Sequence, residues 1–246
     1  MNDIVIINGS PKTKDSVSGM LIGKIEEITG NKIPVYQATQ FIKMENAASA
    51  LADILSARTL LIVFPLYVDG LPAPLVKALG MIEQATGNAE GRLEHDPLST
   101  TNTQRIGQAA GTEGRLPRVY AICNCGFFEA EHTRLALDMV KSFSACAGMG
   151  WGYGVGVGGG GFIGAQSKSM AKGGPAAAVY AALRELCKAM QDESAGSQTA
   201  HQNVFATPKV PRSLYLILAN MEWRRTAKKY GAAKSLNARP HSPSHS

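Results

Sequence analysis

Residues 59–64, Thr-Leu-Leu-Ile-Val-Phe, constrain the fold more than any other segment of this chain. The run is almost wholly apolar and does not alternate, whereas a strand with one face in water would alternate apolar and polar residues. It predicts a strand buried on both faces, inside a parallel sheet that carries helices on each side. Such a sheet requires strands and helices to alternate along the chain.

That alternation extends through most of the sequence. We expect further strands at 4–7, 33–36, 119–123 and 152–157, and helices at 17–28, 45–56, 74–84, 130–147 and 176–190. Pro34 removes a backbone donor, which places the second strand toward an edge of the sheet. The pattern predicts an α/β fold with a doubly wound, five-stranded parallel sheet and helices on both faces.

The length of 246 residues suits one α/β domain with an appendage. We expect a domain at 1–195 with a polar loop insertion at 86–118, a basic helical extension at 208–238 and a disordered tail at 239–246. No apolar stretch has the length of a membrane span, and the chain begins with a strand instead of a signal core. A cytoplasmic location follows as the expectation.

The net charge of +6 comes from the end of the chain. Residues 209–246 hold eight Lys or Arg and one acid, Glu222, which leaves 17 basic and 18 acidic residues in the remainder. A nucleic-acid-binding protein would more often spread its cations over a groove with aromatic residues between them. We therefore expect no nucleic-acid partner.

The four cysteines do not form a metal-binding pattern. Cys123 and Cys125 place two thiols on one face of a strand, but no second pair completes a site. We interpret all four as buried thiols in a reducing compartment and expect no bound metal.

The first strand leads into a loop that suits a phosphate group. Gly9 permits a sharp turn, Pro11 fixes the backbone, and hydroxyls follow at Ser10, Ser16 and Ser18. Free N–H groups and the positive end of the next helix dipole favour a phosphate monoester, and Lys12 or Lys14 could add a charge. An ordinary helix start capped by Ser16 would show much of the same pattern.

Two further loops follow the carboxyl ends of predicted strands, where ligands bind in open α/β sheets. The loop at 65–72 holds Tyr67 and Leu71 between prolines, and the loop at 124–129 exposes an aromatic residue after a buried strand. A phosphate on the first loop and a planar ring between the other two describe flavin mononucleotide, FMN.

A glycine run at 156–161 formally satisfies the dinucleotide-binding pattern G-x-G-x-x-G. No acidic residue ends a second strand about twenty residues later, where a ribose contact would be expected. We interpret the run as a flexible loop that borders the flavin site, not as a nicotinamide-binding fingerprint.

The three loops, in this order, resemble those of the flavodoxin-like NAD(P)H-dependent FMN reductase and quinone reductase superfamily. The motifs are Gly-Ser-Pro-Lys, Pro-Leu-Tyr and Asn-Cys-Gly-Phe-Phe-Glu-Ala-Glu-His, within residues 1–190. The resemblance implies that Ser10, Lys12, Ser16 and Ser18 hold the FMN phosphate, that Pro65, Leu66, Tyr67, Val68, Asp69 and Gly70 run along the isoalloxazine, and that Asn124, Gly126, Phe127 and Glu129 close its other side. Some relatives carry clustered cysteines for an iron–sulfur centre, but residues 37–58 contain none.

The resemblance implies an FMN-dependent oxidoreductase that passes electrons from NADH or NADPH to a small acceptor such as a quinone or free flavin. No side chain is assigned as catalytic, because flavin N5 carries the chemistry. Asp69 and His132 are considered as catalytic acids, but a turn position for Asp69 and a solvent-facing helix position for His132 are the favoured explanations. A flavodoxin-type electron carrier and a scaffold that has lost its cofactor remain alternatives.

The segment at 213–230 predicts a basic helix with an apolar side. It could pack within a homodimer, lie on an anionic membrane surface or bind an acidic partner. We favour packing in a homodimer, since relatives commonly pair so that both chains line each flavin.

Overall fold

The computed structural model describes residues 3–45, 47–87, 116–165, 170, 173–193, 202–236 and 238. Contacts divide the chain into two compact units, Met1–Lys209 and Val210–Ser246. We describe each unit by itself. The predicted disordered tail and most of the predicted 86–118 insertion lie outside the described residues.

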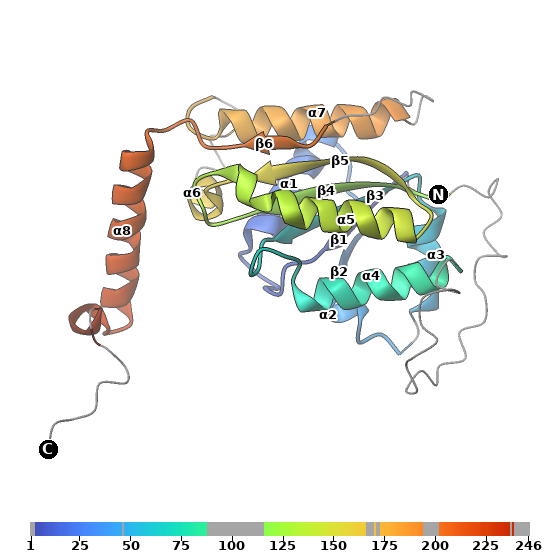
Figure 1. Ribbon diagram of the computed structural model, residues 1–246, viewed down its shortest axis with the longest axis horizontal. Coiled ribbons are helices and arrows are strands. Elements are labelled where there is room, and N and C mark those ends of the chain that lie inside the picture. The colour runs from blue at the N-terminus through green and yellow to red at the C-terminus, as the bar shows by residue number, and fades with distance from the viewer. Residues whose placement is uncertain are drawn as a thin grey trace, which may run out of the picture. The chain divides into compact units, whose positions relative to one another are not determined.

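The first unit is built on one parallel sheet (Figure 1). Its strands, among the described residues, are β1 (Ile4–Asn8), β2 (Val35–Gln37), β3 (Thr59–Pro65), β4 (Arg118–Asn124), β5 (Gly150–Val157) and β6 (Val204–Ala206). They lie in the order β2-β1-β3-β4-β5-β6, and every neighbouring pair is parallel. The predicted parallel sheet is therefore confirmed.

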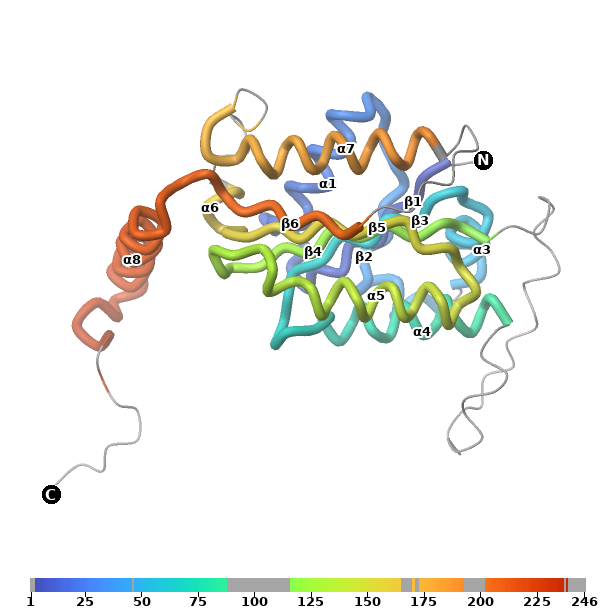
Figure 2. Tube along the Cα trace, turned by 45° about the horizontal axis from the view of Figure 1, so that its top comes forward, coloured from blue at the N-terminus to red at the C-terminus, as the bar shows by residue number. Residues whose placement is uncertain are grey.

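Helices cover both faces of this sheet (Figure 2). The helical elements of the first unit are α1 (Val17–Thr29), α2 (Ala38–Phe41), α3 (Ala48–Ser56), α4 (Ala73–Ala85), η2 (Ala130–Thr133), α5 (Arg134–Cys146), α6 (Gly160–Ala165) and α7 (Ala177–Glu193). One buried apolar cluster joins the sheet to α3, α4 and α5, and a second joins its other face to α1, α6 and α7. Two separate cores, one on each face, result.

Strand β3 lies at the centre of both cores. Every residue from Thr59 to Phe64 is buried, with Leu60 and Ile62 in one core and Leu61 and Val63 in the other. Because alternate side chains of a strand point to opposite faces, only a run without alternation can fill both cores. The expectation from residues 59–64 is confirmed.

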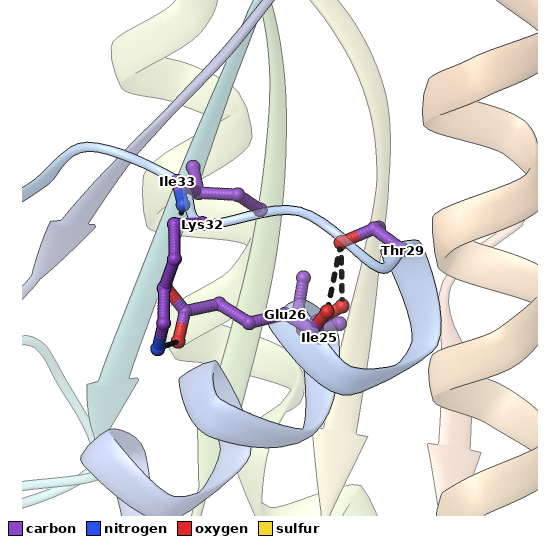
Figure 3. A network of polar contacts seen from close by, with 5 residues as sticks. All are labelled: Ile25, Glu26, Thr29, Lys32 and Ile33. Carbon is purple, nitrogen blue, oxygen red and sulfur yellow. Dashed lines mark hydrogen bonds and ion pairs between the residues drawn. The ribbon is translucent and has the colours of Figure 1, made fainter.

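The ends of α1 are set by local chemistry. Ser16 Oγ accepts a hydrogen bond from Gly19 N, and Gly30 ends the helix in the left-handed region with its N–H donating to Glu26 O. Glu26 then fixes the chain beyond the helix, since its carboxylate accepts hydrogen bonds from Lys32 Nζ at 2.7 Å and Ile33 N at 3.2 Å (Figure 3). The bond from Lys32 holds the pKa of Glu26 below its ordinary value. This network directs the chain into β2.

Several elements differ from the sequence expectation. The described residues form six strands instead of five, because β6 adds to the edge beyond β5 through Val155 and Val204. A three-residue edge strand has too little sequence for a period to be visible, and its pairing depends on the finished sheet. The predicted second strand begins only at Val35, and α6 forms where the sequence predicted a glycine-rich loop.

The second unit contains α8 (Arg212–Lys229) and a short helical turn, η4 (Ala233–Ser235). Within this unit, taken by itself, no residue of α8 is buried. Among the residues that the structure describes, no helix combines the length and the apolar composition needed to cross a membrane.

Candidate functional site

Three loops gather at one edge of the sheet. They follow the carboxyl ends of β1, β3 and β4, which are neighbours in the strand order. The chain crosses from β1 to β2 on one side of β1 and then to β3 on the other, so the strand order reverses between β1 and β3. Ligands of open α/β sheets bind outside the carboxyl ends of the strands at such a point.

The loop after β1 is shaped by its own side chains. Asn8 Oδ1 accepts a hydrogen bond from Ser10 N at 3.0 Å, and Ser10 Oγ accepts one from Lys12 N at 3.2 Å. Asp15 adopts a φ of 51°, which is rare for a residue other than glycine and turns the chain into α1. The loop is therefore held in one shape by its own hydrogen bonds and backbone conformation.

This loop offers an anion several donors. The first N–H groups of α1, at Val17 and Ser18, have no acceptor within the helix, and the dipole of this 13-residue helix is positive at this end. Lys12 and Lys14 are exposed on the loop, and the first turn of α1 contains no acidic residue. The arrangement fits a phosphate monoester.

The predicted phosphate-binding serines occupy different positions. Ser16 is partly exposed and caps α1, whereas Ser10 and Ser18 are buried. Ser18 Oγ donates its hydrogen bond to Asn124 Oδ1 at 2.9 Å. The Ser18 hydroxyl proton thus connects α1 to the end of β4.

Asn124 joins all three loops. Its backbone oxygen accepts a hydrogen bond from Leu66 N at 2.8 Å, while its side chain accepts the bond from Ser18. The residue is buried, and it pairs with Pro65 in the β3–β4 register. The side-chain oxygen and the backbone oxygen of this buried residue thus accept bonds from two different elements and fix their relative position, because leaving either oxygen unpaired would cost free energy.

The loop after β3 forms a tight, strained turn. Tyr67 and Gly70 exchange two backbone hydrogen bonds of 3.0 and 2.9 Å, and the residues between them, Val68 and Asp69, have φ angles of 47° and 58°. Two successive positive φ angles are typical of a type I′ turn, which prefers Asn and Gly. A β-branched residue such as Val68 is an outlier there. Tyr67 is about half exposed and Val68 fully exposed.

The loop after β4 presents Phe127 beside His132. Phe127 is 55% exposed, and its ring centroid lies 4.5 Å from that of His132. His132 Nε2 lies 3.9 Å from Glu129 Oε2, and both side chains are about half exposed. These positions agree with the interpretation of His132 as a solvent-facing residue of the first helical turns.

Cys125 lies beneath this loop as a protonated thiol. Its Sγ is 3.7 Å from the backbone oxygens of Phe127 and Glu129. Burial raises the pKa of Cys125 to about 11, so the thiol is not ionised near neutral pH. Since the thiolate is the nucleophilic form, Cys125 acts as a packing residue here.

The glycine run packs against the same loop. Gly158, Gly159 and Gly160 donate their N–H groups to Ala206 O, Phe127 O and Cys125 O. A Cβ added to Gly158 would lie 2.2 Å from Phe128 O, so glycine is needed for close backbone packing. These N–H groups already have acceptors, which agrees with the interpretation that the run is not a nicotinamide-binding fingerprint.

Sequence reasoning missed residues that hold the site from outside the three motifs. Gln37 Nε2 donates to Ser10 O, and Asn8 shapes the first loop. Thr207 Oγ1, just after β6, accepts a hydrogen bond from Ala130 N at 3.1 Å. Asn8 and Gln37 are paired in the β1–β2 register, so their place at strand ends could have indicated them.

Comparisons with known proteins give structural likenesses at low identity. No protein-family model matches the sequence, and no curated protein matches it. The Trp repressor binding protein from Bacillus subtilis is 15% identical, with a TM-score of 0.44 over 68% of this chain and 96% of that chain. An azoreductase from Bacillus anthracis is 14% identical, with a TM-score of 0.42 over 78% of this chain and 100% of that one. An NADH:FMN oxidoreductase is 13% identical, with a TM-score of 0.48 over 81% and 91%.

The strand order assigns the fold independently of these likenesses. Strands β2-β1-β3-β4-β5 are parallel and in the flavodoxin-like order, and β6 extends the sheet at one edge. The three predicted loops meet at the carboxyl edge, beside the β1–β3 reversal. This chain therefore has the flavodoxin-like fold that its sequence motifs predict.

Proposed function

We propose that this chain is an FMN-dependent NAD(P)H oxidoreductase that delivers electrons to a small acceptor such as a quinone or free flavin. The observation that supports it most is the connection made by Asn124. It joins a cationic loop with helix N-terminal donors to two loops that expose the rings of Tyr67 and Phe127. This arrangement suits a ligand that carries a phosphate and a planar ring at a fixed separation, as FMN does.

The residues of the first loop fit the phosphate end of FMN. Val17 N, Ser18 N and the ammonium group of Lys12 would bind the phosphate oxygens, with Lys14 as a further exposed cation. Ser10 and Ser18 would act indirectly, by holding the loop in shape and by tying α1 to Asn124.

The residues of the other loops fit the ring end. Bound FMN would supply hydride acceptance and two-electron transfer. The strained turn at Val68 and Asp69 would hold Tyr67 against one side of the ring and exclude water there. Phe127, supported by His132, would cover another side. Preorganised loops lower the cost of binding because little conformational freedom is lost.

The test begins with the visible absorption spectrum of the protein after incubation with FMN and removal of the excess. We expect a retained flavin band that bleaches within seconds when NADH or NADPH is added anaerobically. A retained band that ignores both nucleotides would support an electron carrier instead. Loss of the band would contradict tight FMN binding.

A variant separates the phosphate contact from the rest of the site. Lys12→Ala should weaken FMN binding about tenfold and leave riboflavin binding unchanged, because riboflavin lacks the phosphate. Lys43→Ala, which removes an exposed cation elsewhere, is the matched control. Equal losses for both flavins in Lys12→Ala would contradict the assignment of this loop.

A further inference from the structure

After α7 the chain returns to the sheet as the short strand β6, which lies along β5 (Figure 1). Just before the strand, Asn203 Oδ1 accepts a hydrogen bond from Gly154 N at 2.8 Å. At its end, Ala206 O accepts a hydrogen bond from Gly158 N at 3.1 Å. The edge strand is therefore fixed to β5 at both of its ends.

The residue after β6, Thr207, caps the short helix η2. Its Oγ1 accepts a hydrogen bond from Ala130 N, at the start of η2, at 3.1 Å. The first N–H groups of a helix lack an acceptor within the helix, and the residue just before it often supplies one from its side chain. Glu129 holds that place, and its side chain makes no capping hydrogen bond. Since Ala130 is fully buried, its N–H depends on the Thr207 hydroxyl, 77 positions further along the chain.

Gly156 of β5 allows β6 and η2 to approach each other closely. A Cβ placed on this glycine would lie 2.1 Å from Thr133 Oγ1 and 2.7 Å from Phe205 Cδ1, so these two side chains occupy the space above it. Arg134, the next residue after η2, places its guanidinium 4.6 Å from the centroid of the Phe205 ring. The sixth strand thus contacts η2 at its start through Thr207 and at its end through Phe205.

Helix η2 supports the ring end of the candidate site. His132 belongs to this helix, and its ring centroid lies 4.5 Å from that of Phe127. Thr133 Oγ1 donates a hydrogen bond to Ala130 O at 2.7 Å, which ties the two ends of η2 together. A displacement of η2 would therefore carry His132 with it and remove the support of the Phe127 ring.

We infer that Thr207 is a positioning residue for the candidate flavin site. Its hydroxyl caps η2 from the sixth strand, and this cap keeps the rings of His132 and Phe127 where the flavin ring would bind. The ligand in this inference rests on the proposed function, whereas the cap itself needs no ligand. Thr207 acts through the backbone of η2, so its loss should change the affinity for the flavin ring and leave the phosphate contact intact.

Amide hydrogen exchange, measured by NMR on the flavin-free protein, tests the cap. Thr207→Val keeps the shape of the side chain and removes the oxygen that accepts the bond. The Ala130 amide should then exchange about tenfold faster, while the amide of Ile62 in β3 should be unchanged because the loss is local. Thr207→Ser keeps the oxygen and should restore slow exchange. The control is Thr86→Val, which removes a hydroxyl bond at the end of α4 and should leave the Ala130 amide unaffected.

Titrations with two flavins test the positioning role. FMN and riboflavin should each bind about fivefold more weakly to Thr207→Val than to the wild type, because both carry the ring that Phe127 would cover. Thr207→Ser should bind both flavins as the wild type does. Lys12→Ala gives the contrasting pattern, since it should weaken FMN binding alone.

The outcomes separate this inference from the proposed function. A wild type that binds neither flavin contradicts the proposed function, and the exchange of the Ala130 amide then decides alone whether Thr207 caps η2. An Ala130 amide that is unprotected in the wild type, or that exchanges equally slowly in Thr207→Val, overturns the cap. Faster exchange with unchanged riboflavin binding overturns the positioning role.

Discussion

Val68 occupies a backbone conformation that suits a different residue. Its φ of 47° and complete exposure mean that it contributes strain and no packing within the chain. Asn tolerates this conformation, so Val68→Asn should raise the free energy of unfolding by about 1 kcal/mol. Val76→Asn is the control, since Val76 is also exposed but lies in α4. Urea denaturation measures both, and an equal effect in the two variants would contradict the strain.

The buried hydrogen bond between Ser18 and Asn124 supports a second prediction at the scale of single residues. Ser18→Ala removes the donor and leaves Asn124 Oδ1 buried without this partner, which should cost about 1–3 kcal/mol. Ser142→Ala, at an exposed position of α5, should be nearly neutral. Chemical denaturation measures the cost. If Asn124→Ala and the double variant show no coupling, the bond does not join the loops energetically.

At the scale of elements, the glycine run packs closely against the loop after β4, and this contact can be tested. In Gly158→Ala the new Cβ would meet Phe128 O at 2.2 Å, so the loop after β4 must shift, at a cost of about 3 kcal/mol or more. Gly161→Ala places its Cβ in open space within α6 and should be neutral or slightly stabilising. Thermal unfolding of the two variants gives the comparison, and similar melting temperatures would show that the contact is not rigid.

The central elements were predictable because their local sequences indicate their burial and their end points. The unbroken run of β3 indicates burial on both faces, and Ser16 and Gly30 mark the ends of α1. By contrast, β6 is three residues long and exists through pairing with β5 and the bond from Gly154 N to Asn203 Oδ1. Such an element is a product of tertiary contacts.

The same contrast applies to the candidate site. The three loops could be located because the ends of predicted strands can be read from the sequence. The roles of their residues as flavin ligands remain predictions. The connection of Ser18 to Asn124 spans 106 positions, and no local pattern encodes it. The strain at Val68 was also hidden, because a Val-Asp pair does not indicate a type I′ turn.

At the scale of the whole molecule, the reactivity of the four thiols depends on whether the chain is folded. Burial raises the pKa of Cys125 to about 11, that of Cys187 to about 12 and that of Cys123 well above its ordinary value. Cys146 is partly exposed, so the prediction that all four thiols are buried is wrong for this residue. We expect one thiol to react quickly with a disulfide reagent at pH 8 and the other three only after denaturation. Cys146→Ser should abolish the fast reaction. Fast reaction of a second thiol would contradict the burial.

The same pKa shifts give a direction for the pH dependence of stability. The folded chain keeps its buried thiols protonated where the unfolded chain has lost the protons, so the folded state binds more protons above pH 9. The stability is fully present below that pH and falls as the pH rises toward 11 and 12. Urea midpoints at pH 8 and pH 10.5 measure this change, and an unchanged midpoint would contradict it.

The two outer strands of the sheet are both only three residues long. A strand with unpaired backbone groups can recruit a strand from another molecule, and short edges offer little length for such pairing. Strands β2 and β6 therefore close the sheet to growth in either direction. Any contact between copies of this chain would then use helices and loops, and the short edges disfavour the edge-to-edge stacking that begins fibrous aggregation.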